Sequence, residues 1–121
     1  MARDIQERTY CFALEIVRLA MLLGEMNVMR VIGNQVLRSG CSIGANVEEA
    51  QAAHSKRDFA YRMLIALREA RETHYWLRLI GDSCMLRTEY LFALVDEAEQ
   101  LTRILGSIVS KVWGQSKLRS T

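Results

Sequence analysis

Hydrophobic residues recur along this chain at alternating steps of four and three positions. An α-helix has 3.6 residues per turn, so such steps place the hydrophobic side chains on one face of a helix. The pattern predicts four helices, over about residues 4–23, 28–53, 56–80 and 89–113. The third has the most regular repeat, at Phe59, Met63, Ala66, Ala70, Thr73, Leu77 and Ile80.

Residues that start or stop helices stand at the predicted boundaries. Ser55 and Thr88 can cap the third and fourth helices with their hydroxyl oxygens. Glycines that can end a helix follow the first, third and fourth segments, at Gly24, Gly81 and Gly114. Beyond the last of these glycines, we expect the polar tail, residues 115–121, to be frayed.

These elements predict an all-α fold with one domain over residues 1–121. Because the connections are short, successive helices should run antiparallel, which gives an up-down-up-down antiparallel four-helix bundle. A chain of 121 residues is long enough to bury a hydrophobic core. The chain contains no proline and no strand pattern, and both features favour an all-helical protein.

More hydrophobic residues are present than one face of each helix needs. The surplus residues are Tyr10, Leu14, Met21, Leu64, Trp76, Leu79 and Phe92. A broad core would bury them, whereas an oligomer would use them as contact surface between subunits. The pattern fits both interpretations.

The second helix contains an unusual run of small residues between Gln35 and Gln51. Gly40 and Gly44 each cost about 1 kcal/mol relative to alanine in a helix interior. Close approach of another backbone compensates such a cost, because only glycine leaves room for it. We therefore expect this run to pack tightly against the third helix or a neighbouring subunit.

The chain lacks the residue spacings of the common catalytic and metal sites. Di-iron bundles need Glu-x-x-His, which places both ligands one turn apart, whereas here His74 follows Glu72 by two residues. Cys41 has no adjacent base to activate it, and the glycines around it lack the Gly-Lys-Ser/Thr ending of a phosphate loop. We therefore predict no enzymatic activity, no metal and no cofactor.

The three cysteines, Cys11, Cys41 and Cys84, form an odd and widely spaced set that does not make a disulfide framework. Reduced thiols are typical of the cytoplasm. The N-terminus shows no signal pattern, and no uninterrupted apolar run is long enough to cross a bilayer. We therefore expect a cytoplasmic protein without a membrane segment, in which the role of the three thiols is open.

Polar residues follow the second helix at three- and four-residue steps, at Arg38, Ser39, Ser42, Asn46 and Glu49. The third helix offers partners for them between Arg68 and Arg78. A polar network between the two helices would select one specific packing arrangement.

The net charge is only +2, but the basic residues are unevenly distributed. Thirteen of the 16 are arginine, which favours bidentate contacts with phosphate or carboxylate. The candidate nucleic-acid contacts are Lys56, Arg57, Arg62, Arg68, Arg71, Arg78, Arg103 and Lys111. Tyr75 lies among them and offers a ring on which a base can stack. Alternatively, these arginines pair with acids on solvated helix faces.

Residues 37–50, 55–59 and 66–79 together closely resemble the bacterial four-helix-bundle family whose founding members are encoded in intervening sequences of 23S ribosomal RNA genes. The matching positions are Arg38, Ser39, Gly40, Ser42, Gly44, Asn46, Glu49, Glu72, Tyr75 and Trp76. Cys41 stands where the family commonly has threonine. The resemblance covers nearly the whole chain in length and helix order.

This resemblance implies a small cytosolic bundle without established enzymatic activity. Some members are rings of five bundles, and a related accessory factor of diversity-generating retroelements is a pentamer that binds nucleic acid and a reverse transcriptase. By analogy, we expect a homo-oligomer, a homopentamer in particular, that binds RNA or DNA. The alternative is a protein-interaction scaffold that binds a protein partner and no nucleic acid.

Overall fold

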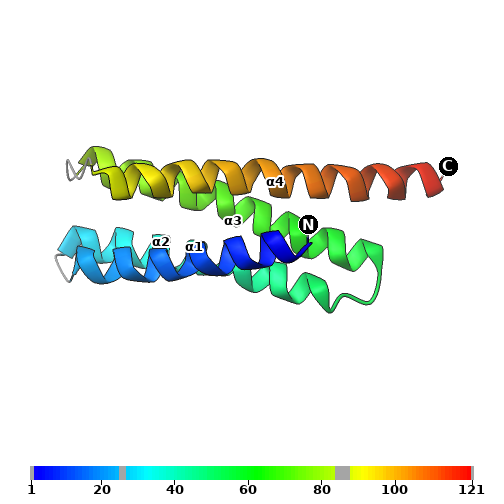
Figure 1. Cartoon of the computed structure of the whole chain (residues 1–121), viewed down its shortest axis with the longest axis horizontal. Coiled ribbons are helices and arrows are strands. Elements are labelled where there is room, and N and C mark those ends of the chain that lie inside the picture. Colours follow the sequence, from blue (N-terminus) through cyan, green and yellow to red (C-terminus); the bar gives the residue numbers. More distant parts are fainter. Residues whose placement is uncertain (1, 25–26, 84–87, 121) are drawn as a thin grey trace.

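The computed structural model describes residues 2–24, 27–83 and 88–120, and within these ranges the regular structure is entirely helical. The helices are α1 (Ala2–Leu23), α2 (Asn27–Gln51), α3 (Lys56–Ser83) and α4 (Glu89–Ser120). Consecutive helices run in opposite directions along one common axis (Figure 1). The predicted all-α, up-down-up-down four-helix bundle is therefore confirmed.

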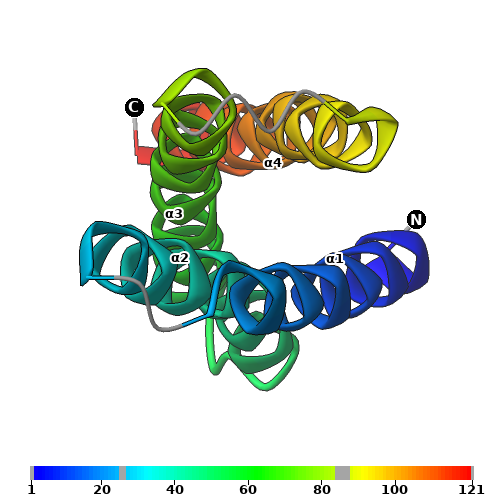
Figure 2. The same cartoon turned by 90° about the vertical axis from the view of Figure 1, so that its left-hand side faces the viewer.

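The bundle is not equally closed on all sides. The pairs α1–α2, α2–α3 and α3–α4 pack along their lengths, whereas α1 and α4 approach at few places, and within the described ranges no Cα atom of α1 lies within 8 Å of one of α3. Viewed from one end, α1 and α4 form two arms on the same side of the molecule, with α3 opposite α1 (Figure 2). The open side between α1 and α4 was not predicted from the sequence.

Both predicted serine and threonine caps are present. The Ser55 hydroxyl accepts the backbone N–H of Asp58 at 3.0 Å, and the Thr88 hydroxyl accepts the N–H of Leu91 at 3.2 Å. Each bond satisfies a donor that the first turn of a helix leaves without a partner. These local signals therefore set the starts of α3 and α4.

The three glycines expected to end helices behave differently. Gly24 ends α1 with a φ of 66°, the left-handed conformation that glycine adopts without strain. Gly81 instead stays inside α3, buried where an added Cβ would lie 2.9 Å from Leu91 Cδ2. Gly114 also remains helical, so α4 continues to Ser120, where a frayed tail was expected. A glycine ends a helix only where the chain must turn, and neither of the last two positions requires a turn.

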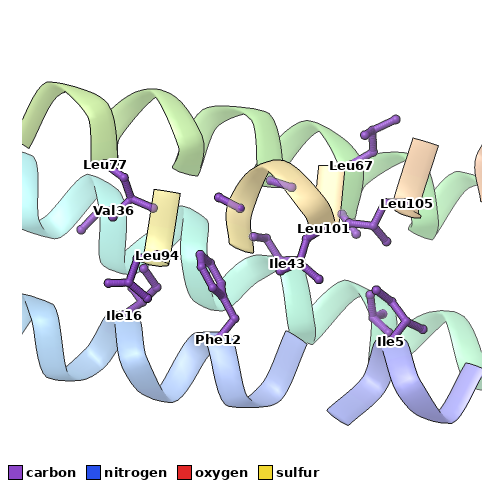
Figure 3. Close-up of a cluster of buried hydrophobic side chains, with 14 of the residues drawn as sticks. Ile5, Phe12, Ile16, Val36, Ile43, Leu67, Leu77, Leu94, Leu101 and Leu105 are labelled. Atoms are coloured by element: carbon purple, nitrogen blue, oxygen red, sulfur yellow. The ribbon is translucent and has the colours of Figure 1, made fainter. Parts of the chain in front are cut away.

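The core runs along the interior of the bundle (Figure 3). Its largest fully buried side chains include Ile16, Leu19, Val36, Ile43, Met63, Leu77, Ile80, Leu91, Leu101 and Leu105. On α4, the four–three spacing predicts an inward face made of Leu91, Val95, Ala98, Leu101, Leu105, Ile108 and Val112. This prediction was partly wrong: Leu94 and Val109 are buried, whereas Val95, Ile108 and Val112 are only half-buried. α4 packs along its length on α3 and meets α1 at few places, and its buried face is rotated accordingly.

The glycine run of α2 makes the close contact that its composition predicted, but with a different partner. A Cβ on Gly40 would lie 2.9 Å from two side-chain carbons of Ile16, and one on Gly44 would lie 3.3 Å from the backbone oxygen of Thr9. Both neighbours belong to α1, so the expectation of α3 or a neighbouring subunit was wrong for these two residues. The lost helix propensity is offset by this close approach of α1.

Candidate nucleic-acid interface

The outward surface of α3 carries basic and aromatic side chains in one row. Its members are Arg57, Tyr61, Arg68, Arg71, Tyr75 and Arg78, and all are exposed. Steps of three, four and seven residues place them on one face of the helix. We call this row the α3 stripe. None of its arginines forms an ion pair within the part of the chain that the structure describes.

Two acids of α3, Glu69 and Glu72, are held by Arg38 of α2. Its guanidinium donates to Glu69 Oε2 at 3.2 Å and to the carboxylate of Glu72. It also donates to the side-chain oxygen of Gln35 at 3.1 and 3.2 Å. The indole N–H of Trp76 donates to the same oxygen of Glu72 at 2.9 Å. Glu72, which stands four residues from Arg68, is therefore oriented toward α2.

A second polar contact between α2 and α3 lies in the interior. Ser39 and Thr73 are fully buried, and their hydroxyl oxygens lie 2.9 Å apart. Each hydroxyl also lies within hydrogen-bond distance of a carbonyl of its own helix, Ser39 of Gln35 at 2.9 Å and Thr73 of Glu69 at 2.7 Å. This pair lies directly beside Arg38, so the two polar contacts fix the same register between the helices.

The rest of the polar row of α2 does not join this network. Asn46 donates to the carbonyl and hydroxyl oxygens of Ser42 at 2.9 and 3.1 Å, entirely within α2. Glu49 is exposed. The predicted network between α2 and α3 therefore consists of Arg38 and Ser39, and it does not extend to the other three residues.

The structure also divides the eight basic residues suggested by the sequence. Arg57, Arg68, Arg71 and Arg78 belong to the α3 stripe. The others do not: Lys56 is exposed outside the row, Arg62 is half-buried, Arg103 pairs with Glu99 at 2.6 Å, and Lys111 lies on α4. Tyr61 was missed, although its position four residues after Arg57 could have revealed it.

The α3 stripe has the chemistry that nucleic acid requires. Guanidinium groups bind phosphate oxygens in bidentate geometry, and exposed tyrosine rings stack on bases of any identity. Tyr61 and Tyr75 are 56% and 50% exposed, so their ring faces are accessible. Tyr75 also meets Trp76 edge to face, with ring centroids 5.1 Å apart, which orients its ring.

The residue types that bind metals or act as nucleophiles can also be located in the structure. Across residues 2–24, 27–83 and 88–120, no three His, Cys, Asp or Glu side chains gather as a bound metal ion would require. Burial raises the pKa of the Cys41 thiol, which is the opposite of what a nucleophilic cysteine needs. No helix in the described ranges combines the length and apolar character needed to cross a membrane.

A second exposed row lies on α1 and is hydrophobic. Tyr10, Leu14, Val17 and Met21 are 63%, 40%, 39% and 76% exposed, at steps of four, three and four. We call this row the α1 stripe. It lies away from the buried face of α1, so that helix is hydrophobic on two sides. Of the surplus residues, Phe92 is also exposed, whereas Leu64, Trp76 and Leu79 are half-buried. An exposed row of this kind is typical of a surface that another molecule covers.

Comparisons with known proteins agree on the fold. The family described as 23S rRNA-intervening sequence protein matches residues 2–107. A similar solved structure is that of a protein of unknown function from the S23 ribosomal protein family of Bacteroides thetaiotaomicron, with 36% sequence identity and a TM-score of 0.81. The match covers 87% of this chain and 97% of that one. No functionally curated protein matches the chain.

Proposed function

Because this chain belongs to the 23S rRNA-intervening sequence protein family, we propose that it is a nonenzymatic, homo-oligomeric protein that binds RNA or DNA. The observation that carries the proposal is the α3 stripe, in which two exposed tyrosines lie among four arginines that form no ion pair with any described residue. This arrangement offers phosphate contacts along one line and stacking surfaces between them.

Assembly would strengthen such binding. The α1 stripe supports contacts between copies, and among the described residues the backbones of α1 and α3 do not approach closely. Contacts made through α1 therefore leave the α3 stripe of each copy accessible. Several stripes on one particle raise the effective concentration of binding sites, which compensates for a net charge of only +2 per chain. The family resemblance makes five copies the expected number.

The proposal includes a cytoplasmic location. Cys11 and Cys41 are free thiols, as expected of a protein in a reducing compartment, and Cys84 lies outside the described residues.

The direct test measures the affinity of the full-length protein for a fluorescent single-stranded RNA and an RNA duplex as the salt concentration rises. We expect the logarithm of the binding constant to fall linearly with the logarithm of the salt concentration, because phosphate contacts release counterions. The triple variant R68Q/R71Q/R78Q should bind more weakly and show a shallower slope. The matched control R18Q/R30Q/R103Q removes three exposed arginines outside the α3 stripe and should bind nearly as the wild type does.

A second candidate function is a protein-interaction scaffold, favoured by the α1 stripe. In that case, the four exposed apolar residues of α1 bind another protein instead of a second copy. Undetectable RNA and DNA binding at low salt, together with a monomeric mass in solution, would favour the scaffold over the nucleic-acid binder.

A further inference from the structure

The two tyrosines of the α3 stripe stand at equivalent places on the helix. Tyr61 and Tyr75 are 14 residues apart, which is nearly four full turns, so both lie on the same side of α3. Their separation along the helix axis is about 21 Å. Both rings are half exposed or more, although Tyr75 also contacts Trp76. Two aromatic rings are therefore accessible along one line of the helix.

Arginines stand at regular positions beside these rings. Arg57 precedes Tyr61 by four residues, and Arg71 precedes Tyr75 by the same step. Arg68 lies midway between the two tyrosines, seven residues from each. A nucleotide whose base stacks on either ring therefore has a guanidinium about one helical turn away for its phosphate.

The rings of the stripe offer nothing to a double helix. In a duplex the bases stack on one another, and a protein reaches only their edges through the grooves. Contact with the phosphates of a duplex requires positive charge and no aromatic ring. The bases of an unpaired strand, in contrast, stack on aromatic side chains, and this contact tolerates every base. Exposed tyrosines among the arginines therefore favour an unpaired strand.

We propose that the α3 stripe binds an unpaired nucleic-acid strand that runs along α3, with one base stacked on Tyr61 and another on Tyr75. A stacked strand rises about 3.4 Å per nucleotide, so the two bases are about six nucleotides apart, and fewer when the strand is extended. Arg57, Arg68 and Arg71 bind the phosphates beside and between these bases. This inference rests on the proposed nucleic-acid binding and adds the class of ligand.

The first measurement compares one sequence in its single-stranded and double-stranded forms. The probe is a fluorescent RNA built of A and C only, which does not pair with itself, and about ten nucleotides match the length of the stripe. It is bound by the full-length protein at one low salt concentration, alone or annealed to its complement. A purely electrostatic row would favour the duplex, which carries about one negative charge per 1.7 Å. We expect the opposite order, with the single strand bound about fivefold more tightly or better.

The second measurement separates the rings from the arginines. The variant Y61A/Y75A should weaken single-strand binding by about fivefold or more for each ring and leave duplex binding unchanged. Y61F/Y75F keeps both rings and should bind the single strand as the wild type does. The control Y10A removes a 63% exposed tyrosine from α1 and should leave the affinity unchanged. Circular dichroism checks that every variant keeps its helix content.

The same sequence made as DNA identifies the source of the unpaired strand. Tighter binding of the RNA strand than of the DNA strand would support an RNA ligand, because the 2′-hydroxyl is what a protein uses to separate the two. Equal affinities would support contacts with base faces and phosphates alone, which both strands share.

The outcomes separate this inference from the proposed function. Duplex binding as tight as single-strand binding, or an unchanged affinity of Y61A/Y75A, would overturn the unpaired strand. If R68Q/R71Q/R78Q still weakens the complex in that case, the proposed nucleic-acid binding stands without it. No detectable binding of either form at low salt would overturn both.

Discussion

Arg38 of α2 holds the carboxylate of Glu72 of α3, the acid that stands one helical turn from Arg68. In an isolated helix, Arg68 and Glu72 would be ion-pair neighbours at a spacing of four. In the folded chain, Arg38 of α2 instead binds the carboxylates of both Glu72 and Glu69. The positive charge of the α3 stripe therefore depends on a residue of another helix.

The first prediction concerns Arg38→Met, which removes the guanidinium and keeps the aliphatic part of the side chain. Arg38 is half exposed, so we expect a loss of only about 0.5–1 kcal/mol in urea unfolding. The released Glu72 is then free to pair with Arg68, so RNA affinity should fall although Arg38 lies outside the α3 stripe. The double variant Arg38→Met with Glu72→Gln should regain affinity, and failure to do so would show that Arg38 does not act through this acid.

The second prediction concerns the contact between α2 and α1. Gly40→Ala places a methyl group 2.9 Å from two side-chain carbons of Ile16, and the Cβ of Ile16 lies only 3.3 Å away, so a rotamer change of Ile16 alone leaves a tight contact. We expect a destabilisation of about 1–3 kcal/mol in chemical denaturation. Gly106→Ala is the matched control, because its nearest neighbour is Leu67 at 3.9 Å. That variant should gain up to about 1 kcal/mol from helix propensity. Equal effects of the two substitutions would contradict tight packing at Gly40.

The third prediction concerns the α1 stripe. Leu14→Glu and Val17→Glu each place a charge on a surface that is already solvent-exposed in the single chain, at 40% and 39%. The folding stability of a single chain should change by less than about 0.5 kcal/mol. If copies meet through this row, the double variant should have a lower mass in light scattering than the wild type. An unchanged mass with unchanged circular dichroism would exclude the α1 stripe as the contact.

The fourth prediction concerns the two described thiols. Cys11 is exposed, whereas burial raises the pKa of the Cys41 thiol. The thiolate is the reactive form, so a higher pKa leaves a smaller thiolate fraction at neutral pH. Iodoacetamide should therefore modify Cys11 first, and the rate at Cys41 should continue to rise at pH values where the rate at an ordinary thiol has levelled off. Mass spectrometry of C84S protein over a pH series measures both rates, and equal rates at pH 7 would contradict the assignment.

Local sequence signals were sufficient to predict the four helices and several of their ends. The four–three spacing of hydrophobic residues depends only on helix geometry, and the Ser55 and Thr88 caps bond within their own first turns. The need for a close neighbour at Gly40 and Gly44 was also visible, because the cost of glycine in a helix is intrinsic to the residue.

The partners of these surfaces were decided by packing between distant segments. The glycines of α2 face α1, Leu94 replaces Val95 in the core, and α4 leaves a groove beside α1. Periodicity defines a hydrophobic face of each helix but not how far the helix rotates or which neighbour it meets. The α3 stripe shows the consequence: its arginines can be read from the chain, but their freedom from Glu69 and Glu72 exists only because folding places Arg38 of α2 next to those acids.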